Sequence, residues 1–139
     1  VNTRLQEYQI PIETIHDGSF LSPEVLSVPL NSFANEPFII LRSDNDTGKR
    51  ALTICQENNF TPHTIFRLDQ QMTAYNIACS GMGITFIGDL LLASAPATSE
   101  LIFYKLPGKN CNRNVSFYWK KGRYISRAME EFLKIALPQ

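Results

Sequence analysis

The chain has 139 residues, a hydrophobic content of 44%, and 13 Lys and Arg residues against 13 Asp and Glu residues. This length allows one globular domain, or one domain with an appendage, and a formal charge of zero argues against the basic surface that phosphate-backbone binding needs. No apolar run reaches the roughly 18 to 20 residues of a membrane span, and Val1 begins neither a signal peptide nor an initiator-Met start, so we expect a fragment or a processed product.

Residues 1–29 carry weak local signals. Leu5 and Tyr8 suggest a helical turn that Pro11 interrupts, and His16 to Ser19 is typical of a turn. We expect an irregular segment that leads into the main domain.

Two short runs predict strands. Phe38–Leu41 follows Pro37 and has no polar residue, as expected for a strand buried on both faces. His63–Leu68 follows Pro62 and predicts a second strand.

A helix is predicted between these strands. Asp46 or Thr47 is suited to cap its start, and Asn58-Asn59 suits a left-handed terminus at its end. The residues expected to be buried are Ala51, Leu52 and Cys55.

The stretch from Gln70 to Asp89 begins with another predicted helix, Gln70–Ser80, which Asp69 is placed to cap. Helical spacing gives this helix one packed face. The residues on that face are Ala74, Ile77, Ala78 and Gly81.

Glycines shape the turn that follows. Gly81 and Gly83 permit a tight reversal, because glycine reaches positive φ without steric cost. Ile84–Ile87 then predicts a parallel strand covered on both faces. Gly88-Asp89 ends the strand, and Leu90–Ala93 opens another helix.

The last third of the chain predicts two more strands, Leu101–Leu106 and Val115–Lys120, joined by a polar connection. Ser126 is placed to cap a final helix. The residues that share its apolar face are Ala128, Phe132, Leu133 and Ala136.

Strands that alternate with helices predict an α/β fold with a mainly parallel sheet flanked by helices. In such sheets ligands bind beyond the carboxyl ends of the strands, near helix N-termini. The loops expected at that edge are Ser43–Asp46, Leu68–Gln71 and Ile87–Leu90.

Helix N-termini at this edge offer unpaired N–H groups and partial positive charge, which suit a carboxylate or a phosphate. Arg42 is suited to bidentate binding of an anion, and Ser43 to donating its hydroxyl. The alternative is that Asp44, Asp46 and Asp69 cap their own helices while Arg42 is solvated. Because Asp69 and Asp89 already bring negative charge to helix starts, a zwitterion or a small organic acid fits such a mixed site better than a bare phosphate.

The sequence shows no catalytic or metal-binding constellation. His16 and His63 lack partners at ligand spacing, and no serine lies in a G-x-S-x-G context. Gly81-Met82-Gly83 follows a predicted helix, whereas a phosphate-binding glycine loop follows a strand. We therefore expect a binding module and not an enzyme, with no metal and no cofactor.

Two further features have structural interpretations. Cys55, Cys79 and Cys111 have no CxxC spacing and fit free thiols in a reducing cytoplasm. The run Tyr118–Lys121, with Arg123, has the aromatic and basic residues that stack on bases and contact phosphates. A strand buried against the last helix is the favoured interpretation of that run.

Three segments, in order along the chain, resemble the effector-binding domain of LysR-type transcriptional regulators. They are Leu30–Leu41 (LNSFANEPFIIL), Cys79–Gly88 (CSGMGITFIG) and Tyr124–Leu133 (YISRAMEEFL). Gly88 stands where the family usually has proline. The resemblance extends from about Leu30 to Leu137.

This resemblance implies a lobe of periplasmic-binding-protein type that holds a small effector in a cleft against another lobe. Residues 1–29 would be an atypical hinge segment, 30–114 the effector-binding lobe, and 115–139 a closing strand and helix that pack on the first lobe. The effector-binding positions that follow from the resemblance, together with Arg42, are Ser43, Leu68, Asp69, Gln70, Phe86 and Ile87.

The partners implied are a small organic acid or amino-acid-like effector, a homodimer or higher oligomer, and promoter DNA only through an N-terminal helix-turn-helix. Association is expected through residues 115–137, whose apolar side chains would lack the first lobe. We expect no membrane partner and a cytoplasmic location. A solute-binding protein of the same fold is the alternative function.

We predict that this chain alone does not bind duplex DNA selectively, because its net charge is zero and it contains no recognition-helix pattern. A gel-shift assay with several unrelated duplexes checks this. A salt-resistant complex that discriminates between sequences would contradict it.

Overall fold

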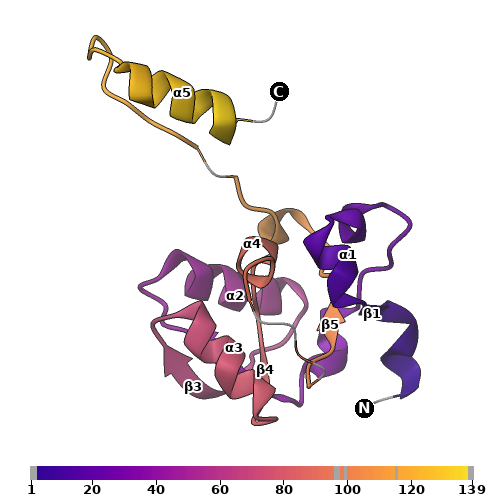
Figure 1. The fold of residues 1–139 in the computed structure, drawn as a ribbon. Coiled ribbons are helices and arrows are strands. Elements are labelled where there is room, and N and C mark those ends of the chain that lie inside the picture. The colour runs from indigo at the N-terminus through magenta and orange to yellow at the C-terminus, as the bar shows by residue number, and fades with distance from the viewer. Residues whose placement is uncertain (1–2, 96–97, 99, 115, 138–139) are drawn as a thin grey trace.

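The computed structural model describes residues 3–95, 98, 100–114 and 116–137. Figure 1 shows a body of helices around short strands, with one helix set apart from it. The strands are β1 (Gln9–Ile10), β2 (Pro37–Leu41), β3 (His63–Leu68), β4 (Ile84–Thr85) and β5 (Phe103–Tyr104). The α-helices are α1 (Ile12–His16), α2 (Asp46–Glu57), α3 (Gln71–Cys79), α4 (Asp89–Leu92) and α5 (Arg127–Ala136). The 3₁₀ helices are Thr3–Tyr8, Ser19–Leu21, Leu30–Phe33 and Lys109–Cys111.

The main sheet is three-stranded and parallel, in the order β3-β2-β4. Side chains alternate along β2, so its two faces contact different helices. Phe38 and Ile40 pack with Ala51 of α2, whereas Ile39 and Leu41 pack with α3. The predicted α/β class with a mainly parallel sheet flanked by helices is therefore confirmed.

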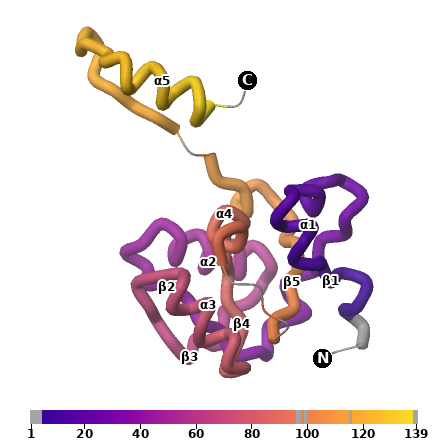
Figure 2. Tube along the Cα trace, viewed as in Figure 1, coloured from indigo at the N-terminus to yellow at the C-terminus, as the bar shows by residue number. Residues whose placement is uncertain are grey.

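A smaller antiparallel sheet joins β1 to β5. Beside it, Ile10 and Ile15 pack with Leu92 of α4 and Tyr75 of α3. The tube view shows this N-terminal part lying against the rest of the body (Figure 2). In the described part of the chain, no helix has the length and apolar character needed to cross a membrane.

Three of the predicted strands need correction. The run Ile84–Ile87 is a strand only at Ile84–Thr85, and its residues are half-buried because β4 is an edge strand. Leu101–Leu106 is reduced to β5, which pairs with β1 outside the main sheet. In Val115–Lys120, residue 115 lies outside the described residues and residues 116–120 form no strand. Apolar runs favour extended backbone, but a strand also needs a neighbour to supply hydrogen bonds.

Two of the predicted helix caps are also wrong. The N-cap of α2 is Asn45, whose side chain accepts a hydrogen bond from the Thr47 N–H at 2.8 Å. The N-cap of α3 is Gln70, with no side-chain bond, so Asp69 lies one residue too early to cap it. The predictions at the other termini are confirmed: Asn59 takes a φ of 62°, and Ser126 accepts a hydrogen bond from the Met129 N–H.

The two glycines of the helix-to-strand turn have different roles. Gly81 adopts a φ of +78°, as predicted, but Gly83 does not lie in the left-handed region. A Cβ atom at Gly83 would lie 2.6 Å from the Pro37 carbonyl oxygen, at the start of β2. Gly83 is therefore needed because two backbones approach closely, and not because of its φ.

The C-terminal residues 116–137 extend away from the body, and we call them the arm (Figure 1). No residue of α5 is buried. The internal contact that stabilises the arm is an edge-to-face pair between Phe117 and Phe132, with ring centroids 5.4 Å apart. On the apolar face predicted for the last helix, Ala128 and Phe132 are thus exposed, and Leu133 and Ala136 are half-buried. The division into segments 1–29, 30–114 and 115–139 stays a prediction.

We predict that Gly83→Ala destabilises the domain by about 1–3 kcal/mol, the usual cost of overpacking. The new methyl group would press on the Pro37 carbonyl, and backbone cannot rotate away as a side chain does. Denaturant unfolding measures the change. Gly88→Ala is the matched control, since its methyl group would meet only the Gln71 side chain at 3.9 Å. Equal midpoints for the two variants would contradict the prediction.

Candidate functional site

The carboxyl ends of β2, β3 and β4 lie at one edge of the sheet, because the three strands are parallel. The chain leaves β2 at Arg42, β3 at Asp69 and β4 at Phe86. Helices α2, α3 and α4 begin shortly afterwards. The loops identified from the sequence therefore do converge on one edge.

On the β2–β3 side of this edge, Arg42 lies between two carboxylates. Its Nε is 3.6 Å from an oxygen of Asp44 and 3.6 Å from an oxygen of Asp69. The Arg42 N–H donates to the Leu68 carbonyl at 2.9 Å. The side chains of Arg42 and Asp69 are 58% and 80% exposed, so these ion pairs contribute little stability. Arg42 and Asp69 therefore form a solvent-exposed pair of opposite charges.

The first turn of α2 is held tightly against the end of β2. A Cβ atom at Gly48 would clash with the carbonyl oxygens of Leu41 and Arg42, so only glycine allows this approach. Asn45 caps the helix and fixes the direction of the preceding loop. Ser43 lies exposed in that loop. The N–H groups of the first turn of α2 therefore lie beside the end of the central strand.

On the β2–β4 side, the same turn of α2 borders a cavity of about 10 Å³. That volume accommodates about one water molecule. The cavity is lined by Ile39, Ile40, Leu41, Thr47, Ala51, Thr85 and Phe86. A ligand larger than water therefore does not fit inside this cavity.

Phe86 and Ile87 point to opposite faces of the chain that leaves β4. Phe86 stacks on Phe38 with centroids 5.9 Å apart and lines the cavity on the α2 side. Ile87 packs with Tyr75 and Leu92 on the other side. Leu68 packs under α3, and Gln70 is exposed at the start of that helix. The structure thus brings Arg42, Leu68 and Asp69 to the β2–β3 side, Phe86 to the β2–β4 side and Ser43 to the exposed loop before α2, and it packs Ile87 away from Phe86. That these residues bind an effector stays a prediction.

Sequence reasoning missed Thr47 and Thr85 in the wall of the cavity. The Thr85 hydroxyl donates to the Ile39 carbonyl at 2.8 Å, which joins β4 to β2. As the one polar residue in the apolar run Ile84–Ile87, it carried a signal that we did not use. The signal at Thr47 was weaker, because a threonine at a helix start is equally well explained as a cap.

Asp46, in the first turn of α2, binds two arginines. Its Oδ2 lies 2.9 Å from Nε of Arg50 and 2.8 Å from a guanidinium nitrogen of Arg113. The hydrogen bonds from Arg50 and then Arg113 lower the pKa of the Asp46 carboxyl below its ordinary value of 3.8. Arg50 also donates to the Asn112 carbonyl. Asn112 and Arg113, which precede the arm, are therefore attached to the same helix turn that borders the cavity.

The other titratable side chains that could carry chemistry make structural contacts instead. His16 contacts the Leu92 carbonyl of α4 through Nε2 at 3.2 Å. Burial raises the pKa of the Cys55 thiol to about 11 and also raises that of Cys111, which makes both thiols poor nucleophiles. Among the described residues, no group of three or more His, Cys, Asp or Glu side chains is placed to hold a metal ion.

A parallel sheet with helices on both faces, and loops that converge at its carboxyl edge, is an α/β lobe of the architecture that binds ligands at that edge. The profile of the family described as "LysR substrate binding domain" matches residues 20–139. The chain therefore belongs to the LysR substrate-binding domain family, whose fold is of the periplasmic-binding-protein type. No solved structure matches the chain significantly.

Two relatives come from Bacillus subtilis (strain 168). The chain is 26% identical to the uncharacterized HTH-type transcriptional regulator YcgK over 110 residues, which are 78% of this chain and 33% of the relative. It is also 26% identical to the uncharacterized HTH-type transcriptional regulator YybE over 106 residues, which are 76% of this chain and 35% of the relative. The chain thus spans about a third of the length of these relatives. Both names favour a regulator over a solute-binding protein.

We predict that Asp46 titrates below pH 3.8 in the folded chain, since Arg50 and Arg113 stabilise its ionised form. A lowered pKa in the folded state means that this contribution to stability is present above pH 3.8 and is lost as pH falls through the folded value. Carboxyl chemical shifts followed by NMR measure the midpoint. Arg113→Gln should raise the midpoint partly, because Arg50 remains. Arg67→Gln, on an exposed position of β3, is the control and should leave it unchanged.

Proposed function

We propose that this chain is the effector-sensing part of a LysR-type transcriptional regulator, and that it binds its effector at the carboxyl edge of the main sheet. The observation that carries the proposal is the recess where β2, β4 and the first turn of α2 meet, with Thr47, Thr85 and Phe86 in its wall. Family membership supports a binding role, and the recess supports the position of the ligand.

The chemistry of the rim favours a small organic acid or an amino-acid-like effector. The N-terminus of α2 offers N–H groups to a carboxylate, and Ser43 and Thr47 lie beside it. Across β2, Arg42 and Asp69 supply one positive and one negative charge. A ligand that carries both a carboxylate and an amino group finds a complementary partner for each. A bare phosphate would meet the carboxylates of Asp44, Asp46 and Asp69.

Other partners follow from the proposed role. Both relatives carry an HTH-type name, so we propose that promoter DNA is bound by a helix-turn-helix of the whole regulator, in the cytoplasm. We also propose that the chain forms a homodimer or higher oligomer through the arm. The exposed apolar side chains Phe117, Trp119 and Phe132 support this association.

We predict that Thr47→Val weakens effector binding by about 2- to 10-fold, the equivalent of losing one hydrogen bond worth about 0.5–1.5 kcal/mol. Ser43→Ala should have an effect of the same size. Calorimetric titration with a panel of small organic acids and amino acids, screened first by thermal shift, measures the affinities.

Thr53→Val is the matched control, because Thr53 lies on the same helix and its hydroxyl binds only the Lys49 carbonyl of that helix. Its affinity should equal that of the unmodified chain. If Ser43→Ala and Thr47→Val both retain full affinity for a ligand that binds, the site lies elsewhere. Unfolding curves confirm that each variant is folded.

A further inference from the structure

Charge is distributed unevenly along this neutral chain. Residues 1–100 contain five Lys and Arg residues and eleven Asp and Glu residues, whereas residues 101–139 contain eight and two. The two parts therefore carry net charges of −6 and +6. The composition argument against a basic surface holds for the average of the chain and not for its C-terminal part. Such asymmetry indicates an interaction surface.

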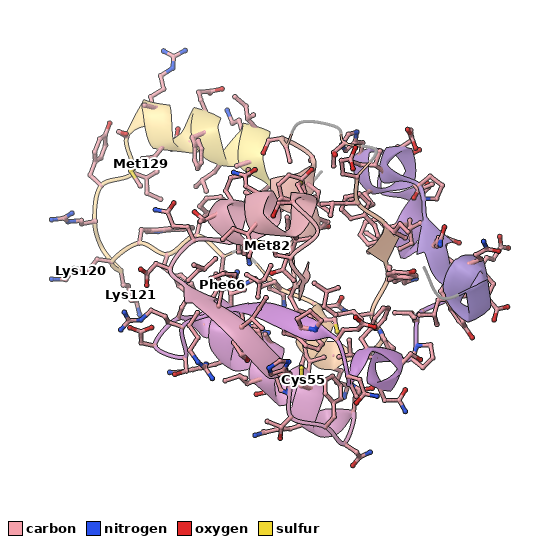
Figure 3. The ribbon with its side chains drawn as sticks, turned by 90° about the horizontal axis from the view of Figure 1, so that it is seen from below. Cys55, Phe66, Met82, Lys120, Lys121 and Met129 are labelled. Carbon is pink, nitrogen blue, oxygen red and sulfur yellow. The ribbon has the colours of Figure 1, made fainter. Side chains whose placement is uncertain are left out.

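The basic part of the chain includes an exposed loop of the arm. Lys120, Lys121 and Arg123 form no ion pair within the described residues. Figure 3 shows Lys120 and Lys121 at the outer edge of the molecule. Beside them, Tyr118 is 91% and Trp119 50% exposed. The strand that would have buried these residues does not form, so the loop presents a basic and aromatic surface.

The acidic part has its own exposed surface at the N-terminal end. Residues 5–41 contain no Lys or Arg. They contain the exposed acids Glu7, Glu13, Asp17, Glu24 and Glu36, none of which forms an ion pair within the described part of the chain. We call Glu7 to Glu24 the acidic segment. Its charges remain unneutralised in the isolated chain.

An apolar groove lies next to the acidic segment, where β1 meets β5. Its volume is about 390 Å³, which is large enough for an indole side chain. Its lining includes Ile10, Ile12, Leu101, Ile102 and Phe103. Glu7 and Glu13 flank the part of the chain that forms one wall of the groove. This surface therefore complements an aromatic side chain with basic neighbours, because the groove accommodates the ring and the two carboxylates face the positive charges.

The arm does not reach the acidic segment of its own chain. Figure 1 shows the arm projecting from the body, with α5 set apart from α1. The complementary surfaces of one chain are thus free to meet those of another.

We propose that, in a homodimer, the basic loop of each arm docks on the acidic segment of the other copy. Trp119 enters the groove between β1 and β5, while Lys120 and Lys121 face Glu7 and Glu13. The proposal rests on the proposed association through the arm and specifies the surface that the arm contacts. Reciprocal exchange makes the two contacts identical, as two-fold symmetry requires, and neutralises both exposed charges.

Nucleic acid is the other macromolecule that a basic and aromatic loop fits. The second copy is favoured because the complementary charge and an apolar groove occur on the same chain. A nucleic-acid strand would account for the loop but would leave the acidic segment and the groove without a role.

A charge-exchange experiment on the 139-residue chain tests the docking. One variant carries K120E and K121E, and the other carries E7K and E13K. Each variant alone would face like charges, so sedimentation at low salt should show dimerisation at least about 10-fold weaker than in the unmodified chain, from the reversal of two exposed pairs at each contact. An equimolar mixture of the two variants should restore the dimer, because each arm then meets an oppositely charged segment.

Two controls make the result specific. K49E with R67E changes the net charge as much as K120E with K121E, but outside both surfaces, and should dimerise like the unmodified chain. W119A should weaken the dimer at low and high salt alike, whereas Y118A should not, because Tyr118 lacks a groove to fill.

The outcomes separate this proposal from those on which it depends. Dimers that form equally in both charge variants would overturn the docking surface while leaving association through the arm intact. A monomer for the unmodified chain at every concentration would overturn both. If K120E with K121E instead abolishes binding of a single-stranded oligonucleotide and leaves the dimer unchanged, the loop is a nucleic-acid site and the docking proposal fails. The effector titration is independent of all three results.

Discussion

Burial of β2 on both faces is the constraint on which the other elements depend. Its residues Phe38, Ile39, Ile40 and Leu41 are all buried, and together they contact both large helices and both neighbouring strands. Complete burial of one such side chain is worth about 1.5–3 kcal/mol, so this short segment contributes a substantial part of the core. Glycines stand where other segments cross its two ends, Gly83 at Pro37 and Gly48 at Leu41. The geometry of the site follows, because the close approach at Gly48 brings the N-terminus of α2 to the end of the central strand.

The elements that the sequence predicts well are those whose signal is local. β2 is a continuous apolar run, and the apolar residues of α2 and α3 recur at helical spacing. Ser126 is a favourable N-cap residue directly before α5. The strands near residues 101–106 and 116–120 fail because the same apolar character is compatible with extended chain that has no ladder partner. Which segment pairs with which is decided by packing over long distances, and β1–β5 pairing leaves no mark in either local sequence.

In the candidate site, too, some features follow from local sequence and others depend on long-range packing. The three loops were predictable, because parallel strands place their carboxyl ends together whatever the details of the sheet. The separation of Phe86 from Ile87 follows from the alternation of side chains along extended backbone and was available from the sequence. By contrast, the Arg42–Asp69 pair and the wall formed by Thr47 and Thr85 depend on how far β3 and β4 run before they end. No sequence motif specifies the residue at which either strand ends.

Helix α2 links the recess to the arm. Its inner side lines the cavity through Thr47 and Ala51, whereas its outer side contacts residues 110–113, which precede the arm. The outer contacts are Asp46 with Arg113, Arg50 with the Asn112 carbonyl, and Glu57 with Asn110. The proposed effector site and the residues that lead into the arm therefore share the first turn of α2. In our proposal, a change in the position of this turn would alter the effector contacts and the placement of the proposed association surface together. That shared turn is the connection that we propose between effector binding and assembly.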